Sequence, residues 1–360
     1  MNITILILCF SVAFAISLGS TPIVKNLAYK IGAVDVPNDE RRVHKEPIPR
    51  LGGLAIFYGF LIALLCFAKP IDSQMRGIII GSLIIVGVSI IDDVKQLRAI
   101  VKLSAQVLAA VVVVVHDVRI TAISVPASIV EGGVLQLGMW SIPITIGWII
   151  VVTNAVNLID GLDGLAVGVS SIASFSLFFI AILGGEESVA IIAAALAGGC
   201  LGFLPYNFNP AKIFMGDTGS QFLGYMLSVI CIQGLFKGYV IISFIVPLLI
   251  LGLPLFDTVF AIVRRAWNHK PIMGADRGHL HHRLLDSGFT QKETVAILYV
   301  IATVLGLSAV LVLERGSYVA AMLLLVAIAT AFGLYKLLRK RFNRKRAEKE
   351  AAKNLNSTNE

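Results

Sequence analysis

Five aspartates stand where long apolar segments of this chain begin or end. Asp92 and Asp93 close one apolar segment in "IDDVKQLR", Asp160 and Asp163 follow another in "NLIDGLDG", and Asp217 precedes a third in "FMGDTGS". An ionised carboxylate beside hydrocarbon is costly, so acids at such positions usually mark a functional site. Carboxylates that gather near Lys, Asn and His are what metal-assisted chemistry on phosphates requires.

The motif "NLIDGLDG" spaces its polar residues at helical intervals. Asp160 and Asp163 are three apart, and Asn157 precedes Asp160 by three, so on a helix the three would share one face. Gly161 and Gly164 remove side-chain bulk and let a ligand or another helix come close. A solvated helix end with small-residue packing is the alternative. Two acids and an amide on one face are costly without a cation, which favours a cation site.

Asp217 begins a new apolar segment and has two interpretations that do not exclude each other. As an N-cap it would accept hydrogen bonds from the first N–H groups of the helix. A helix N-terminus also attracts phosphate, and Asp217 would then hold the Mg²⁺ that bridges the phosphate. Asn207 and Phe214 lie just upstream. Phe214 has the shape to stack on a nucleobase, or to anchor the chain at the membrane interface.

Asp92 and Asp93 are neighbours, and neighbouring residues on a helix point in different directions. They therefore need not share a role. One can face a reacting group while the other pairs with Lys95 or caps the turn. The alternative is a short charged turn without a chemical role.

A basic segment near residue 280, "GADRGHLHHRLLDSG", contains Arg277, His279, His281 and His282. A zinc site would need four ligands at known spacings, and no cysteine accompanies these histidines. Donation to phosphate oxygens fits the segment better. A second basic segment, "DVPNDERRVHKEPIPRLGG" (35–53), is interrupted by prolines. It is either a lid over an anionic substrate or a basic cytoplasmic loop.

The composition is that of an integral membrane protein. Of the 360 residues 57% are hydrophobic and 14% are charged, whereas soluble domains carry about 25% charge. The apolar runs are long and continuous, which indicates membrane-spanning helices and excludes a β-barrel. In the basic tail, 337–360, aromatic residues do not alternate with the basic ones and no nucleic-acid-binding module is recognisable. The tail is therefore expected to bind anionic lipid headgroups rather than nucleic acid.

An all-α polytopic protein with about eleven transmembrane helices is expected. The first is taken as an uncleaved span because no basic residue precedes it. We expect one transmembrane catalytic domain over 1–336, a partly disordered basic tail over 337–360, and a short external β-hairpin or interfacial segment near 117–140. The expected spans are 3–24, 51–68, 77–91, 99–115, 141–158, 165–184, 188–206, 218–236, 239–259, 293–313 and 317–336.

The basic residues predict the orientation of these spans. With the N-terminus outside and the C-terminus in the cytoplasm, 25 of the 30 Lys and Arg residues lie on the cytoplasmic side, as the positive-inside rule requires. The same orientation places all five aspartates at the cytoplasmic face, although they were not used to choose it.

These motifs, in this order, resemble the polyprenyl-phosphate N-acetylhexosamine-1-phosphate transferases. The resemblance runs from about residue 20 to 290. Within that family, "DVPNDERRVHKEPIPRLGG" and "HLHH" are similar to the WecA/TagO-type undecaprenyl-phosphate N-acetylglucosamine-1-phosphate transferases. The muramoyl-pentapeptide branch typically has three consecutive histidines, and Leu280 interrupts them here.

The resemblance implies a multi-pass enzyme of the bacterial plasma membrane. It implies attack of undecaprenyl phosphate on UDP-N-acetylglucosamine (UDP-GlcNAc), with release of UMP, as the first membrane step of teichoic acid or another surface glycan. Another UDP-N-acetylhexosamine or UDP-MurNAc-pentapeptide is the alternative donor, and an ion-coupled transporter is a remote alternative. The partners implied are the two substrates and membrane lipids, without nucleic acid; a homodimer is left open.

Matching motif positions also implies residue roles. Asp217 would bind Mg²⁺, or Mn²⁺ as an alternative, with Asn157 nearby. Asp92 would orient or deprotonate the lipid phosphate, with Asp93 sharing the task. One-step displacement and a covalent aspartyl intermediate both remain open. The other positions implied are Asp160 and Asp163 as catalytic acids at the nucleotide end, and Lys95, Asn207, Phe214, Arg277, His279, His281 and His282 for phosphate or uridine contacts.

Overall fold

The computed structural model describes residues 2–36, 47–124, 133–235, 245–268 and 278–315, and five single positions between 333 and 344. These residues are mostly helical. The helices are α1 (Ile3–Ile31), α2 (Gly53–Phe67), α3 (Ser73–Lys95), α4 (Ala99–Val115), α5 (Ser141–Leu158), α6 (Leu165–Gly184), α7 (Glu187–Asn207), α8 (Gly216–Leu235), α9 (Ile245–Ile250), α10 (Gly252–Trp267), α11 (Leu280–Asp286) and α12 (Gln291–Arg315).

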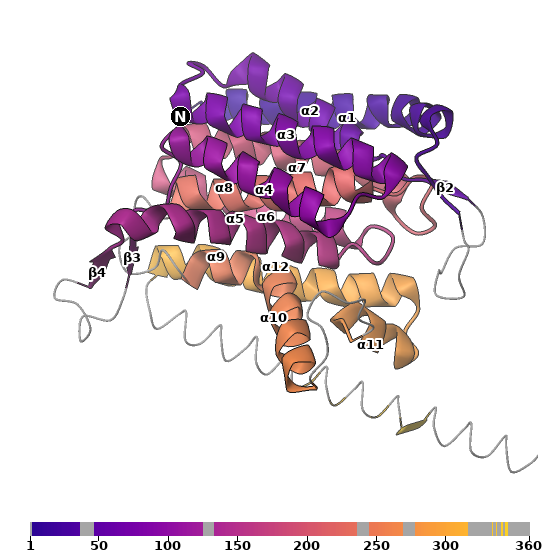
Figure 1. Cartoon of the computed structure of the whole chain (residues 1–360). Helices are drawn as coiled ribbons and strands as arrows, with labels where there is room; N and C mark the ends of the chain where they lie inside the picture. The colour runs from indigo at the N-terminus through magenta and orange to yellow at the C-terminus, as the bar shows by residue number, and fades with distance from the viewer. Residues whose placement is uncertain are drawn as a thin grey trace, which may run out of the picture.

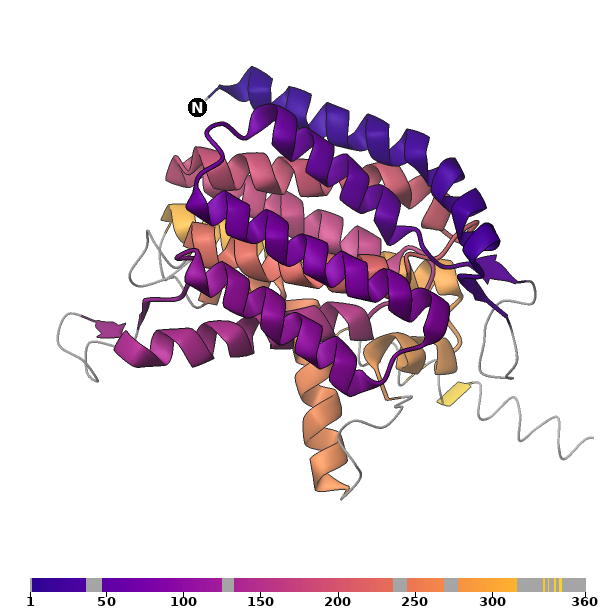
Figure 2. The same cartoon turned by 45° about the horizontal axis from the view of Figure 1, so that its top comes forward.

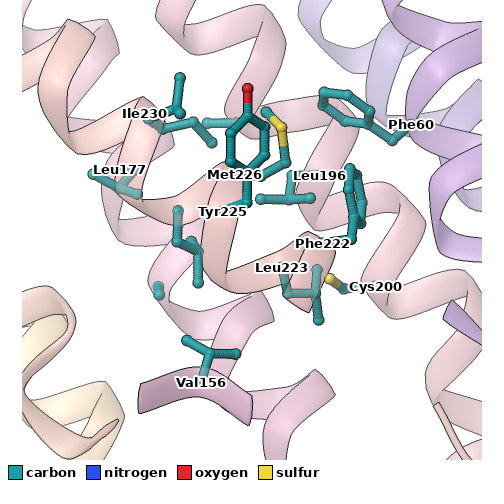
Figure 3. Close-up of a cluster of buried hydrophobic side chains, with 14 of the residues drawn as sticks. Phe60, Val156, Leu177, Leu196, Cys200, Phe222, Leu223, Tyr225, Met226 and Ile230 are labelled. Atoms are coloured by element: carbon teal, nitrogen blue, oxygen red, sulfur yellow. The ribbon is translucent and has the colours of Figure 1, made fainter. Parts of the chain in front are cut away.

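The long helices lie alongside one another in a bundle, and α10 projects away from it in both views (Figures 1 and 2). The inner helix is α8, which packs against α2, α3, α5 and α6. Its side chains are apolar around much of its circumference, as expected for a helix enclosed by others. Phe222, Leu223, Tyr225 and Met226 are fully buried, and Figure 3 shows them among residues of the neighbouring helices, such as Phe60 and Leu196.

Six helices in the described part of the chain are long and apolar enough to cross a membrane, namely α1, α3, α5 with the short turn before it, α6, α7 and α12. Shorter apolar helices, α2 and α4, lie over two further predicted spans. The eleventh predicted span, 317–336, falls almost entirely outside the described residues.

The ninth predicted span, 239–259, is not one continuous helix. Where the structure describes it, α9 ends at Ile250 and α10 starts at Gly252. Pro254 has no N–H to donate to the carbonyl of Ile250, and a proline ring clashes with the preceding helical turn. The chain therefore changes direction here, and α10 leaves the bundle (Figure 1).

Two short antiparallel strand pairs join the helices. One pair, β3 (Ala122–Ser124) with β4 (Val134–Gln136), confirms the hairpin predicted near 117–140. The other, β1 (Val34–Asp35) with β2 (Ile48–Pro49), was not predicted. It brackets the basic segment, of which residues 37–46 lie beyond the described ranges. A bridge between Arg50 and Phe214 then ties this pair to the chain just before α8.

Candidate active site

A cavity of about 510 Å³ opens where α3, α5 and α7 end and α8 begins. Helix ends far apart in sequence meet here because α8 packs against α3 and α5 and touches α7. The structure thereby brings eight of the predicted residues to one cavity wall. They are Asp93, Asn157, Asp160, Asp163, Asn207, Phe214, Asp217 and His282.

Asp92 and Asp217 meet on one ammonium group, that of Lys102. Nζ of Lys102 lies 2.7 Å from Oδ2 of Asp92 and 2.5 Å from Oδ2 of Asp217. Asp92 is on the last turn of α3 and Lys102 on the first turn of α4, so the short connection between these helices places them face to face. Asn157 completes the cluster by donating to Oδ1 of Asp217 at 3.2 Å and to the Ser220 hydroxyl at 2.7 Å.

Asp93 caps α8 from a different helix. Its Oδ1 accepts from the backbone N–H of Asp217 at 2.9 Å. Its Oδ2 accepts from the N–H and the hydroxyl of Thr218 at 3.0 and 2.6 Å. The two neighbouring carboxylates thus have different surroundings, since Asp92 contacts Lys102 whereas Asp93 caps α8. Asp217 does not cap its own helix, because Asp93 already accepts from the first N–H groups.

Asn157, Asp160 and Asp163 do not share a helix face, and that prediction was wrong. Helix α5 ends at Leu158, and the chain turns through Gly164, whose φ of 78° is in the left-handed region. Asp160 and Asp163 therefore lie in the turn between α5 and α6, outside both helices. Asp163 instead accepts from the Asn209 side chain at 2.9 Å and from the Ala211 N–H at 3.0 Å.

Asp160 stands in the turn after α5 with surplus negative charge around it. Burial, together with the charges of Asp217, Asp93 and Asp163, raises its pKa to about 8. Carboxylate and amide oxygens are hard donors, and together with the uncompensated charge of the carboxylates they suit Mg²⁺. Among the described residues, no three histidine, cysteine or acidic side chains form a ready metal centre. The cation seated between Asp92 and Asp217 is the Lys102 ammonium.

The three histidines form a row that runs from the buried His279 and His281 to His282 at the cavity. His279 and His281 stack with ring centroids 5.8 Å apart, and the His281 and His282 rings are 4.3 Å apart. Only His282 of the three lines the cavity. His281 is 3% exposed, and burial, with the neighbouring His282, lowers its pKa to about 4. His281 is therefore neutral at physiological pH.

Two other predicted residues, Lys95 and Asn207, lie away from the cavity or are hydrogen-bonded elsewhere. Lys95 is exposed at the end of α3 and does not line the cavity. Asn207 lines it, but its amide accepts from the Gly164 N–H at 3.1 Å and donates to the Ile213 carbonyl at 3.0 Å. Arg277 lies in a part of the chain that the structure does not describe.

Several residues at the site were not predicted from the sequence. Lys102 carries a usable signal, since it is a lone lysine within the first turn of an apolar segment. Arg50 and Gln291 line the cavity, and Arg50 donates from Nε to the Asp93 carbonyl at 3.1 Å. Asp257, on α10, accepts from His279. Only the fold brings these three to the site, so spacing alone carries no signal for them.

A layer of three amides lies one helical turn from the Lys102 cluster. Gln106 follows Lys102 on α4, Asn154 precedes Asn157 on α5, and Gln221 follows Asp217 on α8. Gln106 donates to Gln221 at 3.2 Å and accepts from Asn154 at 2.8 Å. These bonds fix the register of the three helices that carry the cluster.

Comparison with known proteins gives one family. The sequence model of glycosyl transferase family 4 matches residues 75–235. A probable undecaprenyl-phosphate N-acetylglucosaminyl 1-phosphate transferase of Bacillus subtilis is 43% identical over 83% of this chain and 84% of its own length. A decaprenyl-phosphate N-acetylglucosaminephosphotransferase of Mycobacterium tuberculosis is 35% identical over 77% and 74%. A phospho-N-acetylmuramoyl-pentapeptide-transferase of Desulforudis audaxviator is 33% identical over 82% and 94%.

Proposed function

The chain belongs to glycosyl transferase family 4, and on that premise we propose that it transfers N-acetylglucosamine 1-phosphate from UDP-GlcNAc to undecaprenyl phosphate. An oxygen of the lipid phosphate attacks the phosphorus that carries the sugar. The bond from that phosphorus to the bridging oxygen breaks, and UMP leaves with the electron pair. The product is undecaprenyl-pyrophosphoryl-GlcNAc, which starts a cell-wall polymer such as teichoic acid.

The observation that carries this proposal is the convergence of Asp92 and Asp217 on Lys102, beside an acid-lined cavity whose wall includes Asp217. Two anionic substrates repel each other, so their reaction needs fixed cations and ordered oxygen donors. The cluster lies at the ends of apolar helices, where a lipid phosphate and a soluble nucleotide can meet. The positive-inside distribution of basic residues supports a cytoplasmic location in the bacterial plasma membrane.

Each side chain has a role that its contacts support. Asp217 and Asn157 would hold a Mg²⁺ or Mn²⁺ ion, which supplies charge neutralisation at the pyrophosphate. Asp92 would orient the acceptor phosphate. A phosphate monoester loses its second proton near pH 6, so Asp92 need not be a strong base. Asp160 and His282 also line the cavity and would face the nucleotide.

The relatives support N-acetylglucosamine as the donor sugar, since two of them that carry that sugar in their names are more similar to this chain than the muramoyl-pentapeptide enzyme. A donor panel tests the choice. Purified protein with undecaprenyl phosphate and Mg²⁺ is given UDP-GlcNAc, UDP-N-acetylgalactosamine or UDP-MurNAc-pentapeptide. We expect UMP and lipid product with UDP-GlcNAc and at least about tenfold less with the others.

Asp217→Ala serves as the inactive control in the same assay. Turnover of UDP-MurNAc-pentapeptide above that of UDP-GlcNAc would reassign the donor. Substrate counterflow in liposomes without any UMP would support a transporter and overturn the proposal.

A further inference from the structure

We propose that the Lys102 ammonium occupies the position at Asp217 where the divalent ion would bind, so that metal binding and the Lys102–Asp217 contact exclude each other. The inference deepens the proposed function and rests on its metal ion. It makes Lys102 a built-in competitor that has to leave Asp217 before the site can load its metal.

The contacts of Asp217 carry the first step of the argument. Its Oδ2 is 2.5 Å from the Lys102 ammonium, and its Oδ1 accepts from Asn157 at 3.2 Å. Both carboxylate oxygens therefore already have donors. Mg²⁺ binds oxygen at about 2.1 Å, so an ion on Oδ2 would share that oxygen with the ammonium. Two cations that share one oxygen repel each other strongly, so the ammonium has to leave Oδ2 when the ion binds there.

Both oxygens of Asp92 likewise have a donor. Its Oδ2 accepts from Lys102 at 2.7 Å, and its Oδ1 accepts from the Leu97 N–H at 2.6 Å. The two carboxylates thus chelate an ammonium as they would a metal ion.

The exchange needs only a side chain to move. The amide layer of Gln106, Asn154 and Gln221 holds α4, α5 and α8 in register, so the backbone positions of Lys102, Asn157 and Asp217 stay fixed. The lysine head is on a flexible four-carbon stem. The Lys102 side chain is 28% exposed, against 5% for Asp92, so it can rotate toward solvent. There it can pair with the phosphate of an incoming acceptor.

Direct measurement of metal binding tests the exchange. Full-length protein is titrated with Mn²⁺ while free Mn²⁺ is followed by electron paramagnetic resonance, without substrates. The variants are Lys102→Met and, as a matched control, Lys95→Met. The control removes the same charge from an exposed lysine on the last turn of α3, which also carries Asp92. If Lys102 occupies the site in about 90% of molecules, its removal tightens Mn²⁺ binding roughly tenfold. Lys95→Met should stay within about twofold of wild type.

The direction of the change separates competition from simple damage to the site. A distorted site binds Mn²⁺ more weakly, whereas a site freed of its competitor binds it more tightly. If Lys102→Met does not fold, Lys102→Gln, which keeps a neutral donor for Asp217, takes its place. Binding by the Lys102 variant that is no tighter than that of Lys95→Met would overturn the inference and leave the proposed function standing. Absence of Mn²⁺ binding in wild type and all variants would overturn both.

Discussion

Asp257 and His279 form a hydrogen bond of 3.0 Å between Oδ2 and Nδ1 that joins α10 to the start of α11. The other oxygen, Oδ1, accepts from the Leu280 N–H at 2.8 Å. One aspartate on the projecting helix thus caps α11 and orients the first ring of the histidine row. The row continues through His281 to His282 at the cavity, so α10 positions part of the active site although it stands apart from the bundle.

Asp257→Asn should separate these two tasks. The amide oxygen still accepts from Leu280, but the amide NH₂ then faces Nδ1 of His279 and demands the other tautomer. Loss of such an orienting carboxylate typically costs about 10–100-fold in activity. We expect that loss in kcat with a melting temperature near wild type. Asp257→Ala should lose both, because the helix cap also goes.

Asp286→Asn is the matched control, since Asp286 is an exposed aspartate at the other end of α11. Its turnover should equal that of the wild type. Normal kcat in Asp257→Asn would show that the hydrogen bond to His279 is structural only.

The stability of the protein should fall on mild acidification because of His281. Its pKa is about 4 when folded, below the ordinary value of 6.5. Between these two values the unfolded chain takes up a proton that the folded one does not, so stability drops as pH falls from 6.5 to 4 and is unaffected above that window. The difference amounts to about 2 kcal/mol at pH 5.

Thermal melting of wild type and His281→Asn at pH 7.5 and pH 5 measures this difference. The variant lacks the titrating ring, so it should lose less stability between the two pH values than the wild type does. Equal losses in both proteins would mean that other groups cause the acid sensitivity.

The helices were predictable because each apolar run must satisfy its backbone within itself in a membrane. Helices lie over the expected spans from α1 to α8 and over α12. The described structure departs from the prediction at two points. Pro254 divides the ninth span, and α5 ends at Leu158, so Asp160 and Asp163 lie in the turn that follows it. Hydropathy alone shows neither break.

The candidate site was predictable in its residue types and only partly in its contacts. Four of the five acids at apolar segment ends line one cavity, and Asp92 is linked to Asp217 through Lys102. The partner of each acid depends on how helices pack. Asp92 meets Lys102 rather than Lys95, and Asp93 meets Thr218 across 125 positions of the chain. Spacing within one motif carries no information on such pairs.

Neighbouring aspartates should give different phenotypes when each is changed to asparagine. Asp92→Asn keeps the Leu97 contact but removes the charge that would orient the acceptor phosphate, so we expect turnover to fall by about 10²-fold or more while the fold persists. Asp93→Asn disturbs three hydrogen bonds that begin α8, in a side chain that is 3% exposed. It should cost about 2 kcal/mol or more of stability.

Melting temperature and UMP release, measured on the same preparations, distinguish the two variants. Asp92→Asn should melt close to wild type and Asp93→Asn clearly lower. Matching melting temperatures with matching activities would contradict the different positions assigned to these carboxylates.

Gly161 should be required because His281 packs directly on it. A methyl group at this position would lie 2.5 Å from Nε2 of His281, closer than packed atoms allow, so the ring has to move and shift the histidine row. We expect Gly161→Ala to lower kcat by at least about tenfold, since displacements near 1 Å at a catalytic group have large effects. Gly87→Ala is the matched control, because a methyl group there meets nothing within 4 Å and alanine favours the helix. That variant should keep wild-type turnover and melt at the same temperature or slightly higher. Full activity in Gly161→Ala would show that the His281 ring can shift without affecting the chemistry, and would remove the histidine row from the catalytic site.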